Sequence, residues 1–476
     1  MPESRGASLR EVLNRLKAEV GSIAPRHQPF MTRASYSREL VNAVTFPVAM
    51  AMVEAGVVGI LATKTFTVSK PLYATMMAAP MFANLTSILW ARLARGRSKI
   101  RVICALQCAA LLTVVAVAML PQDRLGQFLL TGLVVLARCL VTGIVTLRST
   151  VWRMNYPRRI RARITGKLAL INTGIFTIVP LAGFSLLDVN PQAFRFVYPI
   201  SAVIAAIGVT AFSRIRIRGE REMLRFETTS HTPPRPHGTP GPIYEYDPVQ
   251  GPANFWTVLR HDHVFRRYMT WQFAAGFSNM MAGTVFIYLI AELTVGKSFE
   301  YVLSVILTTA LPMAFTLLTL PVWAHFLDRV HIVEFRAFQG WFWIICQMGY
   351  WLGAAILSMP ILALTRVVEG TQRGGGMLAW NLGHNDFADR RMVAIYMGIH
   401  VTLTGVRGAI APFVAMALYG GWDQDILFWA GLKVPAFPGI KAHVFLITTV
   451  IAVIAEIGFL SLKSQLRRAS SDAEQG

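Results

Sequence analysis

Cysteine is scarce in this chain of 476 residues, and none of the few copies lies in a loop. The four cysteines fall inside apolar stretches, at Cys104, Cys108, Cys139 and Cys346. A disulfide framework or a structural zinc site would need paired cysteines, or cysteines with histidines, at short spacings. We therefore expect small packing residues at these positions, and no bound metal.

Sequence signatures of nucleotide binding and of catalysis are also missing. The glycine triplet at 374–376 lacks the Lys-Ser/Thr pair of a phosphate-binding loop. The polar run at 381–391 contains no arrangement of a nucleophile with a base. We therefore expect no cofactor, no catalytic residue and no enzymatic activity, and we keep a membrane-embedded transferase as a remote alternative.

Charged residues make up only 15% of the chain, whereas hydrophobic residues make up 54%. A soluble protein of this length would need far more polar surface, so the composition predicts a polytopic helical membrane protein. Lys and Arg outnumber Asp and Glu by 46 to 25, but they are concentrated in connections between apolar segments. That distribution follows the positive-inside bias of membrane proteins, so we expect no nucleic-acid partner.

Long apolar segments predict twelve transmembrane helices in a lipid bilayer. A segment of about 20 residues is long enough to cross a hydrocarbon core of about 30 Å. The predicted segments span residues 41–62, 69–91, 100–120, 127–150, 164–187, 194–213, 267–292, 300–324, 335–357, 359–380, 392–418 and 442–462. The expected parts of the chain are a basic leader (1–40), a six-helix bundle (41–213), a Pro/Gly-rich linker (214–266), a second six-helix bundle (267–463) and a tail (464–476).

The basic residues also predict the orientation of the helices. The leader, the second and fourth connections and the linker are rich in Lys and Arg, whereas the odd-numbered connections are nearly bare. Cytoplasmic loops carry the excess of Lys and Arg, so we expect both termini in the cytoplasm of a multi-pass protein of the cell (inner or plasma) membrane. Apolar residues at helical spacing within 9–20 fit an amphipathic helix on the membrane surface or a solvated helix.

The two predicted bundles share a pattern of residues. Arg138 precedes Trp152 by fourteen residues, and Arg366 precedes Trp380 by fourteen. In each half a polar basic run and an apolar helix with a Thr-Gly pair and a proline follow the tryptophan. A duplication offset by about 230 residues is typical of transporters.

Two six-helix halves joined by a cytoplasmic linker resemble the major facilitator superfamily over residues 38–465. That family carries an acid and several arginines between its second and third helices. Here Arg95 and Arg97 keep the arginines while Ala94 replaces the acid, and the second half carries Asp328 and Arg329. The resemblance implies an electrostatic latch at the cytoplasmic gate, and ordinary positive-inside flanking is the alternative interpretation.

The same resemblance extends to two proline-containing helices. The fifth-helix pattern of proton-coupled exporters persists as Pro180 and Gly183, and Pro412 echoes it in the eleventh segment. Small residues beside proline let helices approach closely and bend, so we expect gating elements there. The exporter pattern is incomplete, and the direction of transport stays open.

Charged side chains inside the apolar segments are the candidate solute and coupling residues, because charge at this depth is costly. Glu54 lies midway along the first segment, where the resemblance implies proton coupling or solute contact, and pairing with Arg138 is the alternative. Arg366, Glu369 and Arg373 share one helix face. They form either an internal ion-pair ladder or a ladder with one arginine left for the solute.

Arg407 is the strongest candidate for solute contact. It lies on one face of the eleventh segment with His400 and Thr404, and no acid occurs on that segment. A guanidinium offers a fork of donors that matches carboxylate or phosphate, which favours an organic anion or zwitterion. Pairing with Glu54 or Glu369 remains open.

These observations predict a secondary active transporter that works by alternating access between its halves. No nucleotide-binding motif is present, so a gradient must drive it, and we expect protons and a small solute as its partners. We expect a monomer to be functional. The alternative is a proton antiporter that exports cationic or neutral drugs or metabolites, and a non-transporting scaffold is a remote one.

Overall fold

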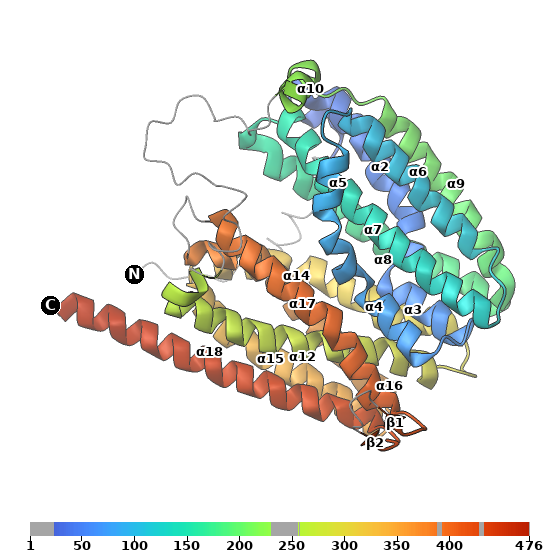
Figure 1. Ribbon diagram of the computed structural model, residues 1–476, viewed down its shortest axis with the longest axis vertical. Coiled ribbons are helices and arrows are strands. Elements are labelled where there is room, and N and C mark those ends of the chain that lie inside the picture. Colours follow the sequence, from blue (N-terminus) through green and yellow to red (C-terminus); the bar gives the residue numbers. More distant parts are fainter. Residues whose placement is uncertain (1–22, 230–255, 257, 388–392, 428–432, 476) are drawn as a thin grey trace.

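The computed structural model describes residues 23–229, 256, 258–387, 393–427 and 433–475, and it is almost wholly helical (Figure 1). The spans of the first half are α2 (Phe30–Met52) continued by α3 (Ala55–Lys64), α4 (Lys70–Leu85) continued by α5 (Ser87–Leu93), α6 (Lys99–Val117), α7 (Arg124–Asn155), α8 (Arg158–Val189) and α9 (Phe194–Ser213). The spans of the second half are α12 (His263–Leu293), α13 (Glu300–Val305) continued by the π segment η3 (Ile306–Ala310) and α14 (Leu311–Leu327), α15 (Ile332–Ala355), α16 (Met359–Leu382), α17 (Val393–Gly420) and α18 (Val444–Gln475).

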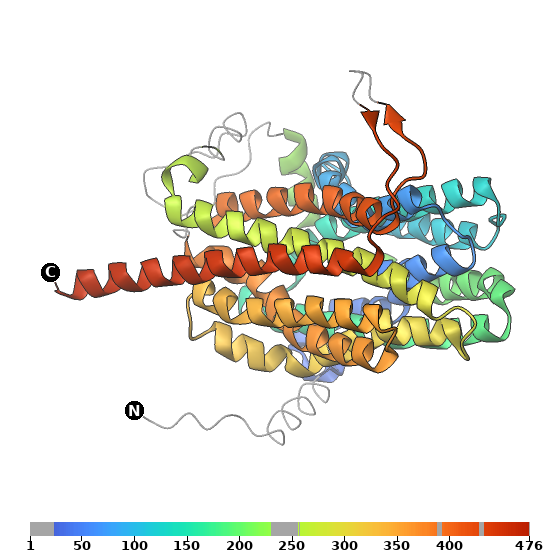
Figure 2. The ribbon, with the colours of Figure 1, turned by 90° about the horizontal axis from the view of Figure 1, so that it is seen from below.

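Short elements occupy the connections. They are η1 (Pro25–His27), η2 (Pro191–Ala193), α10 (Glu220–Thr229), η4 (Gly383–Asp386), η5 (Lys441–His443), β1 (Ile426–Leu427) and β2 (Lys433–Val434). The two strands pair antiparallel, and a bridge between Trp422 and Phe437 extends the pair. This hairpin projects from the helical body (Figure 2).

The protein is an integral membrane protein with twelve spans in two six-helix bundles. Within the described residues, nine helical stretches are long and apolar enough to cross a membrane by length and composition alone. The other three spans are the interrupted pair α4–α5 and the charged helices α15 and α16. Large apolar side chains face outward, as lipid requires, and Phe128, Phe196 and Val203 are all more than 60% exposed.

Successive spans run antiparallel, which gives the molecule two ends. We call the end where α9 finishes and α12 begins the linker end, and the opposite one the far end. Arg38 near the start of α2 donates to the carbonyl of Arg214 at the linker end, and Arg195 at the start of α9 reaches the Ala118 carbonyl at the far end (3.1 Å). The two halves approach one another at the far end and diverge toward the linker end (Figure 1).

The helices extend beyond several predicted boundaries. The first span begins at Phe30 rather than near residue 41, and α18 continues to Gln475 through the predicted tail. Tyr36 explains the early start, because its buried ring belongs to a small core with Tyr156 and Ile164. The predicted leader helix (9–20) and the proline-rich middle of the linker lie outside the described residues, whereas α10 occupies the first part of the linker.

Candidate functional site

A cavity of about 950 Å³ lies between the two halves. It is lined by α8 from the first half and by α12, α14, α15, α16 and α17 from the second. Residues close to the linker end of these helices take part, among them Arg163, Arg336 and Trp380. We call this cavity the vestibule.

The vestibule is strongly basic. Among the described residues that line it are five basic side chains and no acidic one. The basic residues are Arg163, Lys167, Arg336, Arg373 and Arg407. Charges of one sign between low-dielectric walls focus the electric field, so the vestibule attracts anions and repels cations.

A smaller cavity of about 300 Å³ continues the vestibule toward the far end. Met313, Trp343 and Arg373 line both spaces and therefore mark their junction. The other polar residues of this deep compartment are Glu54, Thr308, Thr309, Arg366 and Glu369. The two carboxylates of the site thus lie beyond the basic vestibule.

Glu54 lies in a break of the first span, not midway along a continuous helix as predicted. α2 ends at Met52 and α3 begins at Ala55, with Glu54 in an extended conformation between them. One Nη of Arg138 donates to Glu54 Oε2 at 3.0 Å and to the Val53 carbonyl at 2.8 Å. The predicted alternative, a pair with Arg138, is the arrangement observed.

Arg366 is held by a comparable set of acceptors. It pairs with Glu369, as the helical spacing predicted, and donates to the carbonyls of Leu307 (2.7 Å) and Thr308 (2.6 Å). Those carbonyls belong to the π segment, where the regular helical hydrogen bonds are interrupted. Its guanidinium also lies 4.6 Å from the ring centre of Phe286. Both repeat-related arginines therefore anchor irregular backbone.

Arg373 and Arg407 face the cavity without a carboxylate. Arg373 is exposed and makes no hydrogen bond or ion pair with any residue that the structure describes. Arg407 is buried, and its Nη1 donates to the Gln272 carbonyl at 2.5 Å while its Nε has no partner in the described chain. The predicted alternative, that Arg407 pairs with Glu54 or Glu369, is therefore not what the structure shows.

The other members of the predicted polar stripe are buried beside Trp380. The ring of His400 lies 5.5 Å from that of Trp380, and Thr404 accepts from its indole N–H at 3.4 Å. Neither lines the vestibule, although Trp380 and Arg407 do. Within the described residues no three His, Cys, Asp or Glu side chains gather as metal ligands would.

Comparison with known families identifies the fold. The family profile described as Major Facilitator Superfamily matches residues 42–412, which is most of the chain. The chain belongs to the major facilitator superfamily. A search of curated proteins finds no match.

Solved structures of other superfamily transporters have the same fold at low sequence identity. The nucleoside transporter NupG is 12% identical and superposes with a TM-score of 0.64, over 90% of this chain and 98% of its own. A D-xylose-proton symporter is 12% identical (TM-score 0.60; 90% and 96%). A bacterial homolog of the human lysosomal transporter Spinster, inward-facing and unoccupied, is 14% identical (TM-score 0.56; 92% and 98%).

The two halves of the protein are in close contact at the far end. Asp188 on α8 accepts from the backbone N–H groups of Tyr301 (2.7 Å) and Val302 (3.0 Å) at the start of α13. Thr308 donates to the Gly56 carbonyl at 3.1 Å, and a Cβ on Gly56 would collide with Thr309. Because these contacts join the two halves, the cavity is closed at the far end.

The predicted gating residues fall into two groups. The proline and glycine positions lie on helices that line the cavity, and the arginines lie in a turn at the linker end. Pro180 lies inside α8 and Pro412 inside α17, and a Cβ on Gly183 would lie 3.2 Å from Val197 of α9. Arg95 and Arg97 lie in the turn between α5 and α6.

Asp328 and Arg329 follow the end of α14, and neither makes an ion pair within the part of the chain that the structure describes. The neighbouring helix α15 is capped by Asp386 instead, which accepts from the N–H of Ile332 at 2.7 Å. The latch role of Asp328 therefore stays a prediction.

Sequence reasoning missed several charged residues of the cavity and its surroundings. Arg163, Lys167 and Arg336 are not among the predicted solute residues, yet they line the vestibule. The predicted boundaries place Glu39 in the basic leader (1–40), whereas it is fully buried in α2. Glu456 is a lone acid in the last apolar segment, which was the available signal.

Proposed function

We propose that the protein is a secondary active transporter that moves a small organic anion or zwitterion by alternating access. The observation that carries this proposal is the vestibule, whose lining holds five basic side chains and no described acid. Carboxylate and phosphate groups match the donor fork of arginine. The two acids of the deep compartment are already paired with Arg138 and Arg366, so they do not cancel this charge.

We further propose that the linker end faces the cytoplasm. The leader, the even-numbered connections and the linker carry most of the Lys and Arg, as cytoplasmic loops do. The cavity extends toward the linker end while the far end is closed. With the proposed orientation, this conformation is one that exchanges solute with the cytoplasm.

We propose protons as the coupling ion, since one structurally similar protein is a D-xylose-proton symporter. A gradient-driven transporter needs a group that binds the driving ion in one state and releases it in the other. Export of cationic drugs is the weaker alternative, because a cation would have to enter a cavity whose described charged residues are all basic.

Ligand-induced thermal stabilisation tests the substrate class. The purified protein is screened with organic anions, zwitterions, cations and neutral sugars, together with the Arg407→Ala and Arg373→Gln variants. A ligand that binds only the folded protein at 100 times its Kd stabilises it by about 2.7 kcal/mol. Loss of one charge-assisted hydrogen bond costs about 1.5–3 kcal/mol, so each variant should bind the anion roughly 10–100-fold more weakly.

Arg124→Gln is the matched control, because Arg124 is exposed at the far end and outside the cavity. This variant should respond to ligands as the wild type does. Stabilisation of the wild type by a cation or a sugar, with no response to any anion, would refute the proposed substrate class.

A further inference from the structure

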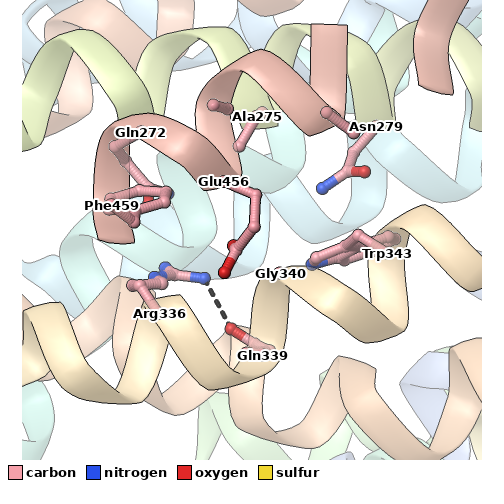
Figure 3. A pocket seen from close by; sticks show the side chains of 12 residues that line it. Gln272, Ala275, Asn279, Arg336, Gln339, Gly340, Trp343, Glu456 and Phe459 are labelled. Carbon is pink, nitrogen blue, oxygen red and sulfur yellow. Dashed lines mark hydrogen bonds between the residues drawn. The ribbon is translucent and has the colours of Figure 1, made fainter. Parts of the chain in front are cut away.

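Glu456 is a buried carboxylate that has no role in the proposed binding of an anion in the vestibule. It lies on α18, is only 2% exposed, and neither of its oxygens has a hydrogen-bond partner among the described residues. Its carboxylate points toward α15, between Arg336 and Gly340 (Figure 3). A buried ionised carboxylate without donors is costly, so this arrangement suits the neutral, protonated form.

A side cavity of about 40 Å³ lies at this carboxylate. It is lined by α12, α15 and α18, and it has room for about one water molecule. Gln272, Asn279, Arg336 and Trp343 line both this side cavity and the vestibule. Glu456 therefore lies next to the space through which water and solute reach the site.

A glycine on α15 makes room for the carboxylate. A Cβ at Gly340 would collide with Glu456 Oε2, so no other residue fits there without moving the acid. The carboxylate thus lies directly against the backbone of α15. The one basic residue of that helix, Arg336, lines the same side cavity.

Arg336 makes no hydrogen bond to the Glu456 carboxylate, whose oxygens have no partner among the described residues. Its Nη1 donates to Gln339 Oε1 at 2.8 Å, and its Nε has no partner in the described chain. No ion pair joins Arg336 to Glu456 within the described residues. Gln339 in turn donates to the Gln372 carbonyl of α16 at 2.9 Å, so Gln339 links Arg336 to the helix that carries Arg366 and Arg373.

The other charged groups near Glu456 are paired with another acid or lie outside the side cavity. Lys463 on α18 pairs with Glu334 of α15 at 2.8 Å. Arg407 of α17 donates to the Gln272 carbonyl of α12 and lines the vestibule but not the side cavity, whereas Arg336 lines the side cavity with Glu456. The buried phenol of Tyr268 also lies on α12. Arg336 is therefore the counter-ion that an ionised Glu456 would use.

We propose that Glu456 is the proton-binding site of the transporter, with Arg336 as its counter-ion. The neutral carboxyl releases its proton to water in the vestibule, and the carboxylate that forms pairs with Arg336, which leaves Gln339. A metal cation is disfavoured, because the guanidinium of Arg336 lines the same small cavity. The proposal rests on the proposed transport function and assigns its coupling ion to α18 rather than to Glu54, which already has a partner.

Infrared spectroscopy during a pH titration tests the site without any solute. The purified wild-type protein should show a buried carboxylic C=O band that disappears as the pH rises. Glu456→Gln should lack this band, whereas Glu54→Gln should keep it. Arg336→Gln should keep the band to a higher pH than the wild type, because the carboxylate loses its counter-ion.

Several outcomes would overturn the assignment. They are an unchanged titrating band in Glu456→Gln, an Arg336→Gln titration identical to wild type, or a titration that shifts when sodium replaces a bulky organic cation. Thermal melting verifies that each variant is folded, and Arg336→Gln tests the site in a chain that keeps Glu456. Because no solute is used, failure here is distinguishable from failure of the anion proposal.

Discussion

The arginines around the cavity fall into two groups at the scale of single residues. Arg138 and Arg366 each bind a carboxylate and backbone carbonyls, so their charge is neutralised and their position fixed. Arg373 and Arg407 line the vestibule without a carboxylate partner among the described residues. Only the second group can offer its charge to a solute, because the first would leave an acid unpaired if it moved.

Glu39 is the most completely satisfied acid of the first half. It accepts from the indole of Trp152 at 2.6 Å, from the hydroxyl of Tyr156 at 3.0 Å and from Arg148 at 3.4 Å. Its side chain is fully buried, and it ties the start of the first span to the end of α7.

Glu39→Ala should lower the stability of the folded protein by about 3–5 kcal/mol, because it leaves Arg148 partly buried and unpaired. The measurement is the midpoint of thermal or detergent-induced unfolding. Glu39→Gln is the control, since it removes the charge but keeps an acceptor for Trp152, and it should lose clearly less. Equal midpoints for wild type and Glu39→Ala would show that this network does not hold the span.

Residue types and helical spacing were enough to predict part of the site. The Arg366–Glu369 pair follows from a three-residue spacing, and Glu54 with Arg138 was one of two stated alternatives. Arg336 and Glu456 could not be brought together in this way, because their helices are far apart in sequence and only tertiary packing joins them. Glu39 was missed because the polar leader obscured the true start of the span at Phe30.

Interrupted helices organise the deep compartment at the scale of secondary structure. The first span breaks at Glu54, and the eighth contains the π segment Ile306–Ala310. Each irregularity frees backbone carbonyls inside the membrane, where an unsatisfied polar group costs several kcal/mol. Arg138 and Arg366 satisfy these groups. Hydropathy predicts neither interruption, since both segments have a mean hydropathy of 1.9, which is high enough for a membrane span.

Asp188 is a helix cap supplied by the opposite half. It accepts from the second and third backbone N–H groups of α13, where a carboxylate also interacts favourably with the helix dipole. This contact exists only while the far end is closed. Asp188 therefore stabilises the observed conformation relative to one that is open at the far end.

Asp188→Ala should weaken the closed far end by about 1 kcal/mol, which is roughly a five-fold change in the conformational equilibrium. A cysteine at Gly283 reports the change in a background whose native cysteines are serine. Gly283 lines the deep compartment, and a Cβ there meets no atom within 4 Å.

Labelling of Gly283→Cys by an impermeant maleimide from the far side should increase several-fold in the Asp188→Ala background. Asp188→Asn, which keeps an acceptor but removes the charge, should give a smaller increase. Labelling that is independent of residue 188 would mean that the cap does not control the far end.

The two halves form a V at the scale of the whole molecule, with the basic vestibule between them (Figure 1). The twelve-span architecture and the duplication were predictable, because they depend on segment length and on residues repeated along the chain. The conformational state was not predictable, because it depends on a few contacts between the halves, such as those of Asp188 and Gly56.

Transport by the reconstituted protein tests the central claim most directly. Proteoliposomes are incubated with a mixture of small organic anions, zwitterions, cations and sugars under an imposed pH gradient, and mass spectrometry quantifies the contents. We predict that an anion or zwitterion accumulates against its gradient with the wild type, and that Arg407→Gln abolishes this accumulation. Movement of cations or sugars alone, or anion accumulation unchanged by Arg407→Gln, would contradict the claim.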